Sequence, residues 1–215
     1  MQPHESQALA AGLAALKLSL DEGQQSALLA YLALIDKWNK VYNLTAVRDP
    51  AEMLTLHLLD SLSVVAPLHR HVGDRPARVL DVGSGAGLPG VVLAIALPQL
   101  QVTCVDTVGK KASFIQQVAS ELRLRNLSAQ HARVESMKID PVDVVTSRAF
   151  ASLVDFTNLT SHHLQPTGVW MAMKGKAPAD ETAALPPSVD VFHVEQLVVP
   201  GLDAERCLVW MRQRP

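Results

Sequence analysis

The sequence predicts an α/β fold in which a mostly parallel, seven-stranded sheet follows an N-terminal group of helices. Two observations lead to this prediction. From residue 77 onward, short apolar runs of strand length alternate with helical segments, the pattern of a parallel sheet covered by helices. Before residue 71, apolar residues repeat only at helical spacing. The chain has 215 residues, 48% of them hydrophobic, which is enough for one such domain with an N-terminal extension.

The N-terminal part is expected to be helical. Residues 1–20 are rich in Ala and Leu, and Ser19-Leu-Asp-Glu22 fits a capping box, which places the start of a second helix near Asp21. Residues 39–48 interrupt the helical pattern, and Pro50 is suited to open a third helix. The apolar faces of the second and third helices consist of Leu28, Tyr31, Leu32, Ile35 and Trp38, and of Leu54, Leu58, Leu62 and Val65. We therefore predict a helical extension over residues 1–70, packed on one compact domain over residues 71–215.

The rest of the chain is predicted to alternate between strands and helices. Strands are expected near 77–82, 101–106, 127–131, 142–147, 168–174, 189–198 and 205–212, and helices over 89–97, 109–124, 151–163 and 180–185. Pro200-Gly201 makes the link between the last two strands short, which favours an antiparallel final pair. Cys104 is expected in the core of the second strand.

Charge and cysteine content narrow the class of protein. The net charge is -2 and the pI is about 6.4, so the chain lacks the basic field of a general nucleic-acid binder. Its two cysteines, Cys104 and Cys207, form no C-x-x-C pair, which favours a reducing compartment and argues against a structural zinc site. No apolar run is long enough to span a membrane, and the N-terminus has no signal-peptide pattern. A cytoplasmic protein is expected.

The segment Asp81-Val-Gly-Ser-Gly-Ala-Gly-Leu-Pro-Gly90 lies between a predicted buried strand and a predicted apolar helix. Glycines in such a turn let the backbone approach a ligand closely, and the helix start offers unpaired N–H groups. Gly85-Ala-Gly-Leu-Pro-Gly90 also satisfies G-x-G-x-x-G, the fingerprint of a dinucleotide site in which a pyrophosphate lies against the helix N-terminus.

Asp81 favours a different ligand. A carboxylate at the strand end would face a pyrophosphate unfavourably, whereas S-adenosylmethionine has no phosphate and carries a sulfonium cation and an ammonium group. Asp106, at the end of the next apolar run, can accept both ribose hydroxyls of either cofactor. We therefore expect S-adenosylmethionine, with a nicotinamide cofactor as the alternative. A parallel sheet with a late antiparallel strand then suits a Rossmann-like methyltransferase domain.

Several further motifs accompany the glycine turn, and together they resemble the bacterial small-subunit ribosomal RNA guanine-N7 methyltransferases, the RsmG or glucose-inhibited division protein B family. The resemblance covers most of the chain. The family usually has Pro or another small residue at the position of Ala86, so this residue should not disturb the turn. The matching segments are Trp38-Asn-Lys-Val-Tyr-Asn-Leu-Thr45, His57-Leu-Leu-Asp-Ser-Leu62, residues 81–90, Arg133-Val-Glu135, Ser147-Arg-Ala-Phe-Ala151 and Met173-Lys-Gly175.

The resemblance implies a cofactor site and a substrate. The implied substrate is one guanine in a stem-loop of 16S ribosomal RNA, met either as naked RNA or within the 30S particle, and the enzyme is expected to be a monomer. The alternative is a methyltransferase of a small molecule, with the helical extension closing over it. The cofactor contacts that the resemblance implies are Gly83, Leu88, Asp106, Val134, Glu135 and Arg148, with Asp81, Gly85 and Gly87 in support.

Methylation of guanine N7 needs no general base, because N7 carries a lone pair and no proton. Alignment of the reacting atoms is then the main task, and Arg148 is a candidate to orient either the cofactor carboxylate or guanine O6. A surface ion pair is the ordinary alternative for this arginine.

Candidate RNA contacts are less specific. Lys174 and Lys176 follow the fifth strand, at the end of the sheet where α/β proteins bind ligands, and are candidates to contact RNA phosphates. Lys110, Lys111, Arg123 and Arg125 are weaker candidates, since exposed helix faces carry such residues without function. His57 and Asp60 are spaced for a mutual hydrogen bond, and Trp38 and Tyr42 for stacking on a base or, more commonly, for packing between helices. No metal site is expected.

Overall fold

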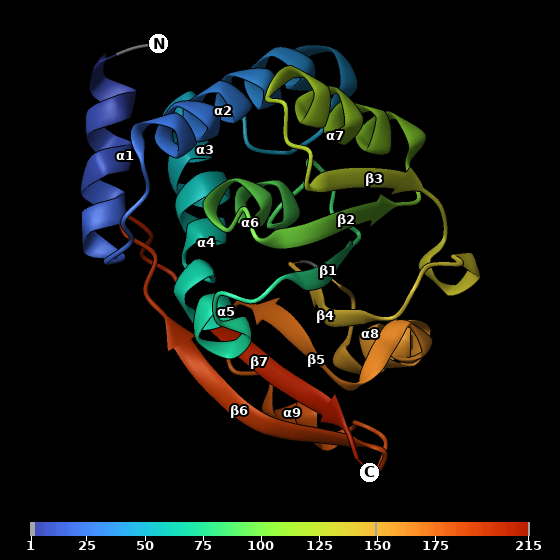
Figure 1. Cartoon of the computed structure of the whole chain (residues 1–215). Helices are drawn as coiled ribbons and strands as arrows, with labels where there is room; N and C mark the ends of the chain where they lie inside the picture. The colour runs from blue at the N-terminus through green and yellow to red at the C-terminus, as the bar shows by residue number, and fades with distance from the viewer. Residues whose placement is uncertain (1–2, 149, 215) are drawn as a thin grey trace.

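The computed structural model describes residues 3–148 and 150–214. One seven-stranded sheet runs through the molecule, with its strands in the order β3-β2-β1-β4-β5-β7-β6 (Figure 1). The strands are β1 (Ala77–Val82), β2 (Leu100–Asp106), β3 (Leu127–His131), β4 (Val142–Ser147), β5 (Leu164–Lys174), β6 (Val189–Leu197) and β7 (Arg206–Gln213).

The sheet has the expected mixture of parallel and antiparallel pairs. β1 to β5 pair in parallel, and β7 is antiparallel to both β5 and β6, which confirms the predicted antiparallel final pair. β5 begins at Leu164, four positions before the predicted start. Its first half includes the exposed Pro166 and Thr167, so the apolar pattern marks only the buried second half.

The N-terminal part is helical, as predicted, but it is more divided than its apolar pattern indicates. In place of one third helix from Pro50 to Val65, the chain forms two short α-helices around a π-helix, and Val65 begins a separate helix. The elements are α1 (Pro3–Ala15), α2 (Glu22–Tyr42), α3 (Pro50–Met53), the π-helix η1 (Leu54–Leu59), α4 (Asp60–Leu62) and α5 (Val65–Val72).

The start of α2 lies where it was predicted, but different residues cap it. Asp21 accepts a hydrogen bond from the backbone N–H of Gln24 at 2.7 Å, and the side chain of Gln24 accepts one from the backbone N–H of Asp21 at 3.0 Å. This is a capping box, so the predicted pair of Ser19 and Glu22 is wrong. The helix also continues to Tyr42, beyond the predicted break at residue 39.

Helices cover both faces of the sheet (Figure 1). On one face, α1, α2, α6 and the helices around η1 share a core with Val79, Val102 and Met171. On the other face, Phe156 of α8 packs against Trp170 and other buried residues of the sheet. The remaining helices are α6 (Gly90–Ala96), α7 (Gly109–Glu121), the 3₁₀-helix η2 (Val134–Ser136), α8 (Leu153–Thr160), the 3₁₀-helix η3 (Ser161–His163) and α9 (Ala179–Ala183).

The N-terminal helices are joined to the sheet domain by packing and by hydrogen bonds. Tyr31 of α2 is fully buried, and its hydroxyl donates to the carbonyl of Ala86 at 2.7 Å. Trp38 packs edge-on against Phe114 of α7. Because burial of one large apolar side chain stabilises a fold by about 1.5–3 kcal/mol, these contacts hold α2 firmly over the glycine turn.

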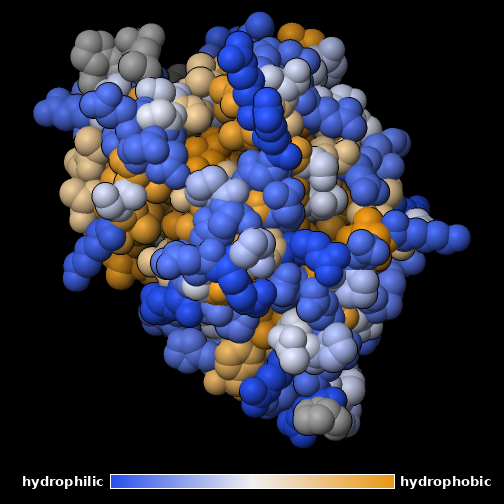
Figure 2. All heavy atoms as spheres, viewed as in Figure 1, coloured by the Kyte–Doolittle hydropathy of each residue, from blue (hydrophilic) through white to orange (hydrophobic). Residues whose placement is uncertain are grey.

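The outer surface is mainly hydrophilic on the face shown in Figure 2, with hydrophobic residues visible on its left side. Within residues 3–148 and 150–214, none of the helices combines the length and the apolar character needed to cross a bilayer.

Candidate active site

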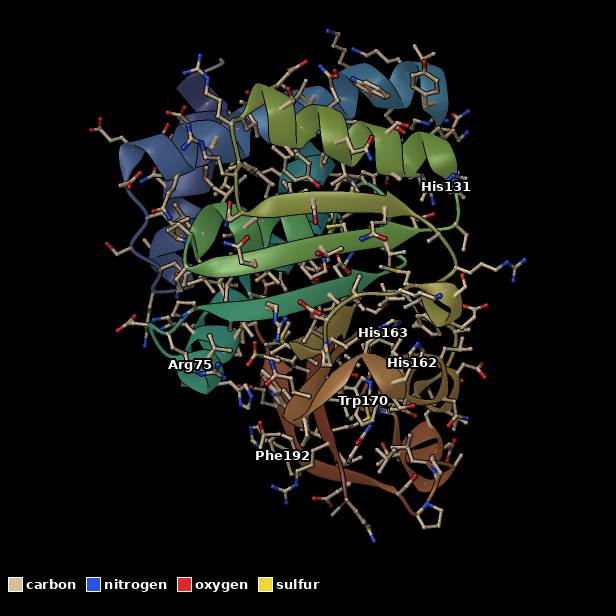
Figure 3. The ribbon with its side chains drawn as sticks, turned by 45° about the vertical axis from the view of Figure 1, so that its right-hand side comes forward. Arg75, His131, His162, His163, Trp170 and Phe192 are labelled. Atoms are coloured by element: carbon tan, nitrogen blue, oxygen red, sulfur yellow. The ribbon has the colours of Figure 1, made fainter. Side chains whose placement is uncertain are left out.

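The carboxyl ends of the parallel strands form one edge of the sheet, and two cavities open there. The strand order changes direction between β1 and β4, and α/β sheets bind ligands outside the carboxyl ends of their strands at such a switch point. Figure 3 shows His131, the last residue of β3, at this edge and Arg75 at the opposite side of the molecule.

The first cavity has a volume of about 430 Å³. It is formed by the ends of β1 and β2 and by residues after β1, β2, β3 and β4, together with one residue each of α7 and α8. Its lining residues are Val82, Gly83, Val105, Asp106, Thr107, Val108, Lys111, Ala132, Val134, Glu135, Phe150, Ala151 and Leu159. Four of the predicted cofactor residues therefore lie together: Gly83, Asp106, Val134 and Glu135.

The glycine turn has a backbone that only glycine adopts easily. Gly83, Gly85 and Gly87 have φ angles of +67°, +59° and +93°, in the region that side chains disfavour. A Cβ atom at Gly83 or Gly85 would meet open space, whereas one at Gly87 would lie 2.4 Å from a methyl group of Val91. The turn thus exposes bare backbone beside the first cavity, and Gly87 lets the turn pack on the helix behind it.

Asp81 lies beneath this turn and is fully buried. One carboxylate oxygen, Oδ2, accepts the backbone N–H of Gly90 at 2.9 Å, so Asp81 holds the start of α6. The other oxygen, Oδ1, has no hydrogen-bond partner among the described residues. Burial raises the pKa of Asp81 to about 7, although the Gly90 hydrogen bond and Arg148 oppose this shift. A buried acceptor without a partner is costly, so a ligand that supplies a donor or a cation would be bound favourably.

Asp106 is oriented by the turn. Its Oδ2 accepts the backbone N–H of Gly85 at 2.9 Å, and its Oδ1 accepts that of Val108 at 2.8 Å. Each carboxylate oxygen keeps a second lone pair, so Asp106 can still accept the hydroxyl groups of a ribose in the first cavity.

Val134 and Glu135 begin η2 and line the same cavity. Val134 is buried, and its carbonyl accepts a hydrogen bond from Nε2 of His163 at 2.7 Å, which anchors the loop. Glu135 is exposed and lies 3.8 Å from Arg133, too far to be held strongly.

Two predicted cofactor residues lie apart from the first cavity. Leu88 is buried in the core beneath the glycine turn. Arg148 lines the second cavity, where Nη1 donates to the carbonyl of Leu56 at 2.7 Å and to Oδ2 of Asp60 at 3.2 Å. Arg148 also lowers the pKa of Asp81, so its guanidinium lies within electrostatic reach of this carboxylate. Phe150 and Ala151, in the same segment after β4, line the first cavity.

Asp60 pairs with arginines and not with His57. Besides Arg148, Nε of Arg206 donates to Oδ1 of Asp60 at 2.9 Å. The expected hydrogen bond between His57 and Asp60 is therefore wrong, because both carboxylate oxygens accept hydrogen bonds from arginines that are distant in the sequence. Trp38 and Tyr42 lie one turn apart on α2 and contact each other, with ring centroids 5.0 Å apart. Trp38 packs between helices through its contact with Phe114 of α7, whereas Tyr42 is exposed.

The candidate RNA lysines differ from each other. Lys174 is 14% exposed, and its ammonium contacts both oxygens of Glu181 at 3.0 and 2.8 Å. Lys176 is exposed. Lys111, considered only as a weak RNA candidate, lines the first cavity.

Several residues of the first cavity were not predicted from the sequence. Thr107 and Val108 directly follow the acidic end of β2, and Phe150 belongs to the Ser-Arg-Ala-Phe motif, so both signals were present in the chain. Leu159 reaches the cavity from α8 and gave no local signal. Among the described residues, no group of His, Cys, Asp and Glu side chains is arranged to hold a metal ion.

The first cavity suits S-adenosylmethionine. Bare backbone at Gly83 faces open space, and Asp106 presents lone pairs for a ribose. Asp81 does not line the cavity, but its unpartnered oxygen beneath the turn favours a cationic amino acid group nearby. A parallel sheet with one antiparallel strand, carrying this turn at its switch point, defines an S-adenosylmethionine-dependent methyltransferase.

Comparison with known proteins agrees and is more specific. A family model described as GidB, rRNA small subunit methyltransferase G, matches residues 24–209. The chain is 62% identical to the Ribosomal RNA small subunit methyltransferase G of Methylibium petroleiphilum, over 99% of this chain and 98% of that protein. It is 63% identical to the protein of the same name from Polaromonas sp., over 96% and 92%.

The chain belongs to the rRNA small subunit methyltransferase G family. It therefore acts on small-subunit ribosomal RNA, in which this family methylates N7 of a guanine with S-adenosylmethionine as methyl donor.

Solved structures with low sequence identity share the fold. A 1,6-didemethyltoxoflavin-N1-methyltransferase from Burkholderia thailandensis, with bound S-adenosylhomocysteine, superposes with a TM-score of 0.59 at 14% identity, over 92% of each chain. TrmN from Thermus thermophilus gives a TM-score of 0.58 at 20% identity, over 75% of this chain and 53% of that one. These two similarities concern the fold alone.

The pKa of Asp81 leads to a prediction about cofactor binding. Since the cofactor is cationic, we expect it to favour ionised Asp81, whose population falls as pH drops through about 7. Affinity for S-adenosylmethionine should therefore be about tenfold weaker at pH 6 than at pH 8. Asp81→Asn keeps an oxygen for the Gly90 N–H and removes the charge. The affinity of this variant for S-adenosylmethionine should therefore not depend on pH in this way. Calorimetry on both proteins at each pH checks the prediction, and parallel pH profiles would contradict it.

Proposed function

We propose that the first cavity holds S-adenosylmethionine and that the enzyme brings N7 of one guanine of 16S ribosomal RNA to the methyl group beside Arg148. The observation that carries this proposal is the glycine turn, which lines the first cavity at Gly83 and covers the free oxygen of Asp81, a carboxylate within electrostatic reach of Arg148. The family to which the chain belongs supplies the substrate class.

The residues of the first cavity and of the glycine turn have separate roles in this proposal. Asp106 accepts the ribose hydroxyls, and Val134 and Glu135 lie at the adenine side. Asp81 neutralises the cationic amino acid end, while Gly83 and Gly85 allow the close approach of backbone. Gly87 and Leu88 support the turn from the core side rather than touching the cofactor.

Catalysis then depends on alignment. The cofactor supplies an electrophilic methyl group, and guanine N7 supplies a lone pair without losing a proton, so no residue needs to act as a base. Arg148 is held by hydrogen bonds to two acceptors, the carbonyl of Leu56 and the carboxylate of Asp60. This fixed cation lines the second cavity and orients the base through O6, the acceptor beside N7. Because N7 faces the deep groove of A-form RNA, the target base must leave a regular helix to reach this site.

The reaction can be tested with RNA that lacks the modification. Labelled S-adenosylmethionine should transfer its methyl group to 16S ribosomal RNA from cells without this gene, and the product should be 7-methylguanine at one position. At saturating cofactor, the single-turnover rate should change little from pH 6 to 8.5. Labelling of small molecules and not of RNA would contradict the proposal.

The same assays address whether the substrate is naked RNA or the 30S particle, and they can be combined with a measurement of the enzyme's oligomeric state. We expect a monomer that works in the bacterial cytoplasm, where ribosomal subunits are made. Parallel assays with naked 16S RNA and with 30S particles identify the preferred substrate.

Lys174, the last residue of β5, and Lys176, two residues further on, are expected to contribute unequally to RNA binding. Lys176 is exposed, whereas Lys174 is already paired with Glu181. Lys176→Ala should weaken RNA binding and reduce the slope of log K against log salt by about one. The double change with Lys174→Ala should weaken binding further, with cofactor affinity kept. Filter binding at several salt concentrations checks this, with Lys17→Ala, exposed in the turn after α1, as the control. Equal salt slopes for all four proteins would assign both lysines to the solvated surface.

A further inference from the structure

The second cavity, of about 460 Å³, has a mixed chemical character. Three cationic side chains line it, but so do a carboxylate, an imidazole and a hydroxyl, and its walls include apolar residues. Its lining residues are Thr45, Val47, Leu56, His57, Asp60, Arg148, Met173, Lys174, Gly175 and Arg206. Donors, acceptors and apolar walls together are typical of a site for a small polar ring, and the volume lies within the range of ligand pockets.

His57 is the residue of this cavity that the fold leaves unsatisfied. It is 2% exposed, and neither ring nitrogen has a hydrogen-bond partner among the described residues. Burial and the nearby Arg148 lower the pKa of His57 to about 4, so the ring is neutral at physiological pH. A neutral imidazole has one donor and one acceptor, and a buried pair of this kind without partners calls for an explanation.

The backbone around His57 is unusual as well. His57 lies within the π-helix η1 (Leu54–Leu59), and such wide turns are rare and frequently occur at functional sites. The carbonyl of Leu56 in the same segment accepts the guanidinium of Arg148. The π-helix therefore brings His57 and an anchored arginine to one cavity.

Asp60 keeps the neighbouring cations in place. It is nearly buried and accepts hydrogen bonds from Arg148 of the segment after β4 and from Arg206 of β7. Arg148 and Arg206 are already paired with Asp60, and Lys174 with Glu181. A phosphate would therefore meet cations that are largely neutralised, beside a carboxylate and a neutral imidazole. A nucleobase, which carries N–H donors as well as carbonyl and ring nitrogen acceptors, matches the mixture better.

We propose that the second cavity receives the target guanine, turned out of its RNA helix, and that His57 hydrogen-bonds the edge of the base remote from N7. This inference rests on the proposed function and adds the location of the base and a specificity-determining residue. The segment after β4 supplies Arg148 to the second cavity and Phe150 and Ala151 to the first, so the two cavities are neighbours along this segment. Because no hydrogen bond fixes the imidazole, the ring can turn toward an incoming base without breaking one.

The test is the replacement His57→Phe, which keeps a buried ring and removes both nitrogens. Since the nitrogens have no partner in the free protein, the thermal midpoint should stay the same or rise, and S-adenosylmethionine affinity should not change. We expect kcat/KM for methyl transfer to 16S RNA to fall by about tenfold to a hundredfold. His57→Gln, which restores a donor and an acceptor, should recover part of the loss.

His71→Phe is the matched control. His71 belongs to α5 of the same helical part, and its pKa is also lowered by burial, but it lies outside the first and second cavities. This variant should methylate RNA within about threefold of the wild type, a difference too small for a lost buried hydrogen bond.

The possible outcomes separate the inference from the proposed function. Normal RNA methylation by His57→Phe, or loss of cofactor binding in that variant, would overturn the inference while leaving the proposed function intact. Failure of the wild type to methylate RNA would instead reject the proposed function. If His57→Phe does not fold, Arg206→Gln tests the second cavity instead. Its control is Arg212→Gln on the same strand, β7, which removes the surface pair with Asp190 of β6. Equal transfer rates in that pair would overturn the inference as well.

Discussion

Replacement of Arg148 by alanine should lower the single-turnover rate of methyl transfer by about a hundredfold or more, because small losses of alignment in a reaction without acid–base catalysis are costly. Arg148 is fixed at two points, the carbonyl of Leu56 and the carboxylate of Asp60. The change removes a cation that lines the second cavity and acts on Asp81. S-adenosylmethionine binding, measured by calorimetry, should change much less than the transfer rate.

Two further variants show whether geometry or charge is needed. Arg148→Lys keeps the charge, but a single ammonium cannot reproduce the planar fork of the guanidinium, so it should restore little activity. Arg75→Ala removes another partly exposed arginine, paired with Asp143 at 2.9 Å on the far side of the molecule (Figure 3), and should leave activity unchanged. A wild-type rate in Arg148→Ala would show that this arginine forms only a structural ion pair.

Replacement of Gly83 by valine should weaken S-adenosylmethionine binding by about 2 kcal/mol, or roughly thirtyfold. The φ angle of Gly83 is +67°, and a Cβ there would project into the open space that the cofactor is expected to occupy. The same backbone angle adds a folding cost of about 1–3 kcal/mol for a residue with a side chain. Calorimetry and thermal unfolding measure the two effects separately.

Gly73 provides a matched control for the backbone cost. It ends α5 with a φ of +66°, and a Cβ there would also meet no atom within 4 Å. Gly73→Val should therefore lose stability but bind the cofactor normally. Cofactor binding by Gly83→Val as tight as by Gly73→Val would show that Gly83 does not line the cofactor site.

The elements of this protein differ in how far they can be predicted from sequence. The strands β1 and β2 lie close to their predicted positions because their apolar runs are bounded by clear turns. The segment 50–65 was predicted as one helix, yet it contains a π-helix. Its apolar spacing is compatible with an α-helix and with a π-helix. Within the π-helix, the carbonyl of Leu56 accepts a hydrogen bond from Arg148, a residue far along the chain that the local spacing does not reveal.

The candidate site divides in the same way. Asp81 and Asp106 were identified from their positions at strand ends, which is local information, and the structure places both at the glycine turn. His57 and Asp60 were expected to pair from their helical spacing alone. Arg148 and Arg206, which lie far along the chain, donate hydrogen bonds to Asp60 instead, and His57 has no partner among the described residues.

The sequence by itself determined the α/β class, the order of the strands along the chain, the glycine turn and the family. Each of these depends on periodicity or on motifs within a few residues. Only the tertiary structure decided that Arg148 lies at a second cavity and not in the first, and that Leu88 supports the turn from the core. Such contacts form between elements that are far apart in the sequence and pack together at the sheet edge. Which distant partner a side chain contacts therefore depends on the distances and the burial that this packing creates.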